Sequence, residues 1–186
     1  MRKIVIDATK LVHSPELQKA SYDKAFSNAA MHWILRRESG RRDLFAGVHG
    51  ALKPSGVFVF EMGGMGNCAE MRSTLLAVVG RRIGIERARE ADPWFFPDET
   101  WMAKMLEEAG FSVERIEREY RPTPADVGGI EGWVRLMGKQ FFDAVEGKER
   151  EECEREACDI LKTVCASPGG GDWIGYVRLR AVARKI

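Results

Sequence analysis

The sequence lacks any long apolar run. No stretch approaches the roughly 20 apolar residues that a membrane-spanning helix needs. The first ten residues, MRKIVIDATK, contain an apolar run far too short for a signal peptide, with Asp7 directly after it. We therefore expect a soluble protein of the cytoplasm.

The sequence also has almost no net charge. Lys and Arg number 29 and Asp and Glu number 28, which leaves a formal charge of +1. Domains dedicated to nucleic acids are usually clearly basic, so this balance argues against such a partner. The 186 residues, 45% of them apolar, are enough for one domain with a hydrophobic core. We expect a single domain over residues 1–186.

Paired metal-ligand cysteines are absent as well. Cys68 stands alone, and Cys153, Cys158 and Cys165 lie on one expected helix without a CxxC pair. The three histidines are not at zinc spacing from them. The pattern predicts reduced thiols and no metal site.

A phosphate-binding loop is not present in this sequence. Gly63, Gly64 and Gly66 follow an apolar strand, but they do not form G-x-G-x-x-G, and no Lys-Ser or Lys-Thr pair follows them. Such glycines allow a tight turn or the close approach of a small ligand to the backbone. The three glycines 169–171 precede a strand and predict a flexible connection.

What the sequence does contain is an alternation of strands and helices. The expected strands are 3–6, 22–28, 57–60, 111–120 and 173–184. The expected helices are 41–52, one capped by Asn67, one capped by Asp98, 131–145 and 147–165, with a turn at 53–56. The strand VFVF is apolar on both faces, as in a parallel sheet covered by helices. We predict an α/β fold with a mostly parallel sheet and helices on both faces.

Open α/β sheets bind ligands beyond the carboxyl ends of their strands. Three polar or glycine-rich strand exits fit this rule: Asp7–Ala8, residues 27–33 and residues 63–67. The carboxylate of Asp7 could accept a hydrogen bond from a ligand amine, or it could cap a turn. The amide of Asn28 offers both a donor and an acceptor.

His32 is the one weak candidate for a catalytic residue. Its ordinary pKa lies near neutrality, which suits a general base. A histidine beside a tryptophan at a strand exit is nevertheless more often a packing residue, and Trp33 suits a pocket wall or the core. Both interpretations remain open at this point.

Four segments of the chain resemble the Rossmann-like S-adenosylmethionine-dependent methyltransferases. They are YDKAFSNAAMHWIL, LKPSGVFVFEMGGMGN, FFPDETWMAKMLEEAGF and GYVRLRAVARK. The most similar branch is the small-molecule group that includes trans-aconitate methyltransferase. The resemblance covers nearly the whole chain and implies S-adenosylmethionine as cofactor and a small-molecule methyl acceptor, without nucleic acid or membrane as partner.

The resemblance also implies roles for individual residues. Asp7 and Ala8 match the position that holds the adenine, and Ser27, Asn28 and Ala29 match the segment beside the methionine part of the cofactor. The residues that it places near the methyl acceptor are His32, Trp33, Gly63, Gly64, Asn67, Trp133, Tyr176 and Arg178. A carboxylate acceptor needs no base, and Arg178 could orient it or could face solvent.

One departure from the family is large. The glycine-rich loop and the ribose-binding acidic residue of the family should stand upstream of KIVID, yet six residues precede Asp7. We expect an N-terminally truncated methyltransferase domain whose sheet lacks two strand–helix units between the third and fourth strands. The neighbouring strands could close up, another chain could fill the gap, or the sequence could be a fragment.

Two other functions are alternatives to methyl transfer. A non-catalytic remnant could bind a partner, including a second copy, through the incomplete sheet. A nicotinamide-dependent oxidoreductase is disfavoured because it needs the same missing phosphate loop.

Overall fold

The computed structural model describes residues 4–186, and the chain divides into two compact units. Unit 1 contains residues 4–65, 94–119 and 178–186, and unit 2 contains residues 66–93 and 120–177. The expectation of one domain over residues 1–186 stays a prediction.

Unit 1 is built on a sheet of four strands in the order β1-β2-β4-β3. Its elements are η1 (Ala8–His13), β1 (Tyr22–Asn28), α1 (Met31–Ile34), η2 (Glu38–Gly40), α2 (Arg41–Ala51), β2 (Leu52–Gly63), α5 (Glu99–Glu108) and the unit 1 parts of β3 (Phe111–Pro124) and β4 (Trp173–Lys185). β1 and β2 are parallel, whereas β2 and β4 are antiparallel. The predicted α/β class is confirmed, but the sheet is mixed, because β4 inserts antiparallel beside β2.

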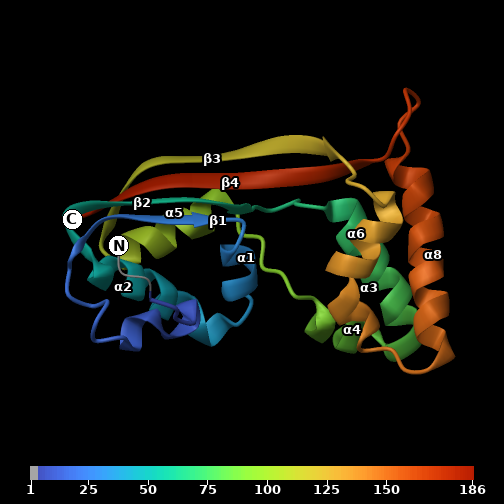
Figure 1. Cartoon of the computed structure of the whole chain (residues 1–186), viewed down its shortest axis with the longest axis horizontal. Helices are drawn as coiled ribbons and strands as arrows, with labels where there is room; N and C mark the ends of the chain where they lie inside the picture. Colours follow the sequence, from blue (N-terminus) through green and yellow to red (C-terminus); the bar gives the residue numbers. More distant parts are fainter. Residues whose placement is uncertain (1–3) are drawn as a thin grey trace. The chain divides into compact units, whose positions relative to one another are not determined.

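The core of unit 1 lies between the sheet and the helices on one of its faces. Along β2, Phe58, Phe60 and Met62 are buried, and the alternate residues between them are only partly covered. The buried side chains join Phe45 of α2 and Leu106 of α5 in one apolar cluster. Figure 1 shows α2 and α5 on this same side of the sheet. Within the described part of unit 1, no helix covers the second face.

The expected strand at residues 3–6 is wrong for the residues that the structure describes. Ile4, Val5 and Ile6 form no strand, and Val5 is fully exposed. Lys3 lies outside the described residues. A strand needs a neighbour to satisfy its backbone, and no described strand pairs with the outer edge of β1. The chain turns instead into η1, which packs on α2.

The expected turn at residues 53–56 is also wrong. These residues belong to the first part of β2, and Leu52 already pairs with Tyr22 of β1. The register shifts between Tyr22 and Lys24, and Ser55 adopts a positive φ of 62°. The proline and glycine of this segment therefore accompany an irregular strand start, a known use of both residues.

Two predicted helix caps had different outcomes. The carboxylate of Asp98 accepts a hydrogen bond of 2.7 Å from the Trp101 N–H and begins α5, as predicted, and Gly110 follows that helix with a φ of +88°. Asn67 does not cap α3 (Ala69–Ile83), because its side-chain oxygen accepts instead from the Val177 N–H at 2.9 Å.

Unit 2 consists mainly of helices, together with its parts of β3 and β4. The helices of unit 2 are α3, α4 (Ile85–Ala91), α6 (Gly129–Met137), α7 (Lys139–Phe142) and α8 (Lys148–Cys165). The expected helix over 131–145 is divided at Gly138, where a Cβ would lie 2.5 Å from the Val134 oxygen. α8 packs against α3 and α6, and all four cysteines are buried. No helix among residues 4–186 is long and apolar enough to cross a membrane.

Candidate active site

The exits of β1 and β2 meet at one edge of the sheet, because the two strands are parallel. Ser27 lies opposite Phe60 and Asn28 lies opposite Glu61 in the register. The Ala29 N–H continues the pairing with a 2.9 Å hydrogen bond to the Glu61 carbonyl. Ala29 has a φ of +50°, which is uncommon for a residue with a side chain. Strained backbone of this kind is concentrated at functional sites.

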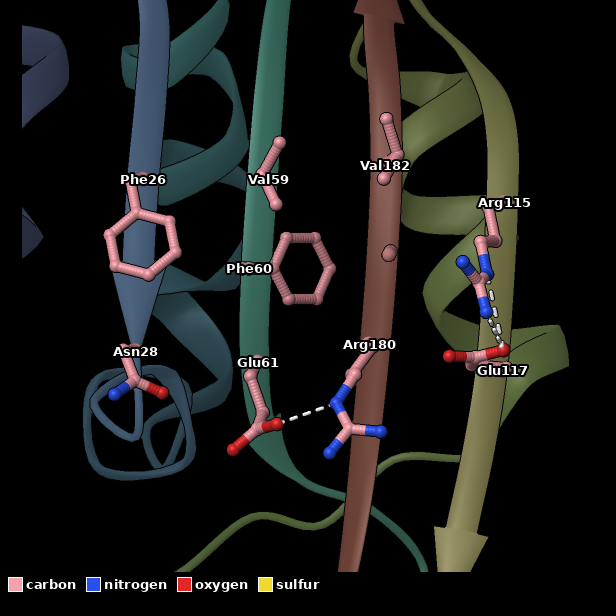
Figure 2. A pocket seen from close by; sticks show the side chains of 10 residues that line it. Phe26, Asn28, Val59, Phe60, Glu61, Arg115, Glu117, Arg180 and Val182 are labelled. Carbon is pink, nitrogen blue, oxygen red and sulfur yellow. Dashed lines mark hydrogen bonds and ion pairs between the residues drawn. The ribbon is translucent and has the colours of Figure 1, made fainter.

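Asn28 opens onto a pocket of about 450 Å³ on the second face of the sheet. Figure 2 shows its amide at the end of β1, near Glu61 and beyond the ring of Phe26. Val59 and Val182 form part of the apolar floor. The pocket therefore combines an apolar surface with an amide and charged groups at the strand exits.

His32 is buried in α1 just beyond this exit. Its Nδ1 accepts a hydrogen bond of 3.3 Å from the Gly63 N–H, which leaves the proton on Nε2. The imidazole packs against the rings of Trp33 and Phe96, with centroids 5.5 and 5.7 Å away. Burial, and then the positive charge of Arg178, lower the pKa of His32 to about 4. The imidazole is neutral at physiological pH, but a pKa so far below neutrality makes it a weak base, and its unprotonated nitrogen already accepts from Gly63. Both observations favour the packing interpretation over the general base.

Glu61 lies between two arginines of β4. Its Oε2 accepts a 2.6 Å bond from the Arg180 Nε, and its Oε1 lies 3.8 Å from the Arg178 Nε. Arg180 also pairs with Glu119, and Figure 2 shows the contact with Glu61. The side chain of Arg178 is 19% exposed. A largely buried cation thus stands beside the neutral His32.

The glycines after β2 serve packing. A Cβ on Gly64 would lie 3.0 Å from the Leu179 Cβ and 3.3 Å from the Arg118 Cδ. Gly63 is buried and donates its N–H to His32. The close approach expected at these glycines is an approach to β3 and β4 of the same chain.

Asp7 caps η1 and Ala8 is the first residue of that helix. The Asp7 Oδ1 accepts from the Thr9 N–H at 3.0 Å and from the Thr9 hydroxyl at 2.8 Å. These two hydrogen bonds lower the pKa of the Asp7 carboxyl. The Asp7 carboxylate therefore caps the start of η1, which was one of its two expected roles.

The remaining predicted site residues belong to unit 2. The Trp133 Nε1–H donates to the Tyr176 hydroxyl at 2.8 Å, so the structure brings a side chain of α6 together with one of β4. Asn67 is buried and bound to the Val177 backbone.

Two charged residues of the strand exit were not predicted, Glu61 and Arg180. Glu61 stands directly after the apolar run VFVF, which is a usable signal because a charge ending a buried strand is unusual. Arg180 gave no local signal, since its place beside Glu61 depends on the antiparallel register of β4 with β2.

Comparison with known proteins identifies the class. No family model matches the chain. An uncharacterized methyltransferase of Schizosaccharomyces pombe is 37% identical over 184 residues, which cover 97% of this chain and 69% of that protein. Among solved structures, a methyltransferase of Bacillus halodurans matches with a TM-score of 0.53 at 14% identity, over 94% of this chain and 74% of its own.

Two further structures share the fold. A SAM-dependent methyltransferase of Methanosarcina mazei has a TM-score of 0.50 at 10% identity, over 98% of this chain and 66% of its own. Loganic acid methyltransferase has a TM-score of 0.53 at 14% identity, over 89% of this chain and 62% of its own. The fold is therefore that of the Rossmann-like methyltransferases.

The chain belongs to the methyltransferase family of its yeast relative. The predicted methyltransferase class is confirmed at the level of the family. S-adenosylmethionine, which the name of the Methanosarcina mazei structure contains, stays the predicted cofactor of this chain. The trans-aconitate branch, the truncation, the cytoplasmic location and the roles of single residues stay predictions.

Proposed function

We propose that this chain binds S-adenosylmethionine at the exit of β1 and transfers its methyl group to a small carboxylic acid. The observation that carries the proposal is the position of Arg178, a largely buried cation at the β2 exit that lies beside the neutral His32 and 3.8 Å from the carboxylate of Glu61. A cation held in such a place attracts an anionic acceptor more strongly than one in bulk solvent does.

Ser27, Asn28 and Ala29 fit a role in holding the cofactor. Asn28 lines the pocket and can both donate and accept, which suits the amino acid part of S-adenosylmethionine. When bound, the cofactor supplies an activated methyl group. Asp7 and Ala8 remain the proposed adenine contacts, although one oxygen of Asp7 already accepts two hydrogen bonds.

The acceptor would lie against the residues of unit 1 that follow β1 and β2. His32, Trp33, Gly63, Gly64 and Arg178 are the candidates there. The roles of Asn67, Trp133 and Tyr176, which belong to unit 2, stay predictions from the resemblance. A carboxylate is already ionised near neutral pH, so no proton has to be removed before attack. Orientation is then the main contribution of the protein, and Arg178 can fix a carboxylate through its planar guanidinium.

Cofactor binding is the first test. Isothermal titration calorimetry with S-adenosylmethionine should give measurable binding, and Asn28→Ala should weaken it by about tenfold, or about 1.4 kcal/mol. Asp7→Ala tests the adenine position in the same way. Ser73→Ala, on α3, is the control and should bind as the unchanged protein does. The absence of heat at millimolar cofactor would contradict the proposal.

The acceptor class is tested by kinetics. A panel of small mono-, di- and tricarboxylic acids is assayed for release of S-adenosylhomocysteine. Arg178→Gln should raise KM for the acids that react, with a smaller effect on kcat, because the guanidinium binds the carboxylate in ground and transition states alike. Reaction with neutral acceptors only would contradict the acidic class.

A second candidate function is self-association through β1, which we propose on the exposure of that strand. Phe26 is 74% exposed, and no described strand pairs with the outer edge of β1. The other edge strand, β3, carries alternating Glu and Arg residues, which protect a sheet edge from pairing. β1 has one Asp and one Lys and is the better surface for a second copy.

Sedimentation velocity tests this alternative. We expect a concentration-dependent dimer that Phe26→Lys dissociates, whereas Arg115→Lys on β3 leaves it intact. A protein that is monomeric at all concentrations would exclude self-association through β1. A dimer that binds no S-adenosylmethionine would favour the non-catalytic function over the enzyme.

A further inference from the structure

Unit 2 contains an open cavity of about 510 Å³ whose lining combines polar groups with aromatic and aliphatic side chains. Tyr120 of β3 and Trp173 of β4 line it, with 67% and 42% of their surfaces exposed. Val164 of α8 and Ile174 of β4 add aliphatic surface. A volume of this size lies in the range of small-molecule sites.

Glu70 is the one acidic or basic side chain among the described residues that line this cavity. No Lys or Arg side chain within residues 4–186 forms an ion pair with it. The wall therefore carries one negative charge and no positive charge. A carboxylate with no positive charge beside it favours a cationic ligand.

The carboxylate of Glu70 is held by the backbone of β4. Its Oε1 accepts a hydrogen bond of 2.5 Å from the Gly175 N–H. A Cβ at residue 175 would lie 3.0 Å from both carboxylate oxygens, so the glycine makes room for this side chain. The Cys68 N–H donates to the Gly175 carbonyl at 2.9 Å and ties the start of α3 to the same residue. The charge is thus fixed in place in the absence of any ligand.

The Cys165 thiol lies in the same wall of the cavity. Burial, and then the charges of Glu70 and Asp172, raise the pKa of Cys165 to about 11. Burial is the larger of these causes, and the thiol therefore stays protonated near neutral pH.

We propose that this cavity binds a small organic ammonium ion that carries an apolar group. Glu70 would receive the ammonium, Tyr120 and Trp173 would offer the faces of their rings to the cation, and Val164 and Ile174 would contact the apolar part. An anion would be repelled by Glu70. A bare divalent cation prefers several oxygen ligands, and the wall offers one carboxylate. The proposal is independent of methyl transfer, because it concerns unit 2 alone.

The test uses three probes of the same size and different charge. Calorimetry at pH 7 compares benzylammonium, benzyl alcohol and benzoate with the full chain. We expect benzylammonium to bind about tenfold more tightly than benzyl alcohol, a difference of about 1.4 kcal/mol, and benzoate to bind least. Equal affinity for the charged and uncharged probes, or no binding of benzylammonium, overturns the proposal.

Two substitutions assign the binding to Glu70. Glu70→Gln keeps an oxygen that can accept from the Gly175 N–H and removes the charge, so the tenfold preference should disappear. Glu149→Gln removes the same charge from the exposed side of α8 and should leave the preference unchanged. Equal effects of the two variants overturn the assignment.

A third variant serves as the test if Glu70→Gln does not fold. If circular dichroism shows that this variant is unfolded, Tyr120→Leu, at an exposed position, tests the cation site instead. Loss of the ring should weaken benzylammonium binding severalfold and leave benzyl alcohol nearly unaffected. Equal losses for both probes would overturn a cation site.

Discussion

The two faces of the unit 1 sheet are built from the same strands and differ in what covers them. On one face, alternate residues of β2 pack against α2 and α5 and are buried. On the other face, Phe26, Val59 and Val182 line an open pocket rimmed by Glu61 and Arg180. The first face is stabilised by packing, whereas the second is free to bind. The packed core and the proposed binding surface thus lie on opposite faces of one sheet, and substitutions on the two faces should differ accordingly.

The largest effect is expected on the covered face. Phe60→Ala should lower the free energy of unfolding by about 3–5 kcal/mol, because it leaves a cavity in the apolar cluster. Val59→Ala, one residue away on the open face, should cost less than about 1 kcal/mol. Urea denaturation of both variants measures the difference, and equal losses would remove the distinction between the faces.

A pH effect is expected at the strand exit, where His32 is held neutral. In the folded state His32 takes up a proton only below a pKa of about 4, whereas the unfolded chain does so below about 6.5. Between these values the unfolded state binds more protons, so stability falls as the pH falls from about 6.5 to about 4. The full contribution is on the order of 3 kcal/mol.

His32→Gln is the matched variant for this prediction. Glutamine can still accept from the Gly63 N–H but does not titrate. The free energy of unfolding of the variant should fall less steeply across that pH range than that of the unchanged protein. If the free energy of unfolding of the two proteins falls in parallel with pH, the pKa of His32 is the same in the folded and unfolded states.

A smaller effect is expected at the turn after β2. Gly64→Ala would force a methyl group against Leu179 and Arg118 and should cost about 1–3 kcal/mol. Gly169→Ala, which meets only the Ser167 hydroxyl at 3.7 Å, is the control and should change the thermal midpoint little. A tolerated Gly64→Ala would mean that β4 can move to make room.

The smallest change in stability is expected on the open face. Phe26→Ser should alter the free energy of unfolding by no more than about 0.5 kcal/mol, because the ring is mostly exposed. Differential scanning calorimetry on dilute protein checks this. A loss of several kcal/mol would show that the ring is buried in solution, as it would be in a dimer.

Local signals explain which parts of the fold could be predicted. The strand 22–28 and the cap at Asp98 depend on patterns within a few residues, and the structure confirms both. The predictions of a strand at 3–6 and a cap at Asn67 were wrong because contacts with distant parts of the chain decide both. Residues 4–6 have no neighbouring strand, and Asn67 bonds to Val177.

The candidate site divides in the same way. The sequence pointed to Asn28 and His32 because both directly follow an apolar strand. It could not supply Glu61 and Arg180 as a pair, because they are 119 residues apart and meet only through the antiparallel register of β2 with β4.

The sequence by itself determined the α/β class, the resemblance to methyltransferases and the strand exits where ligands are expected, because periodicity and strand ends are local properties. Tertiary structure alone decided the direction of β4, the neutral state of His32 and the backbone contact that holds Glu70. Each of these depends on burial or on contacts between distant segments, which a linear pattern does not contain.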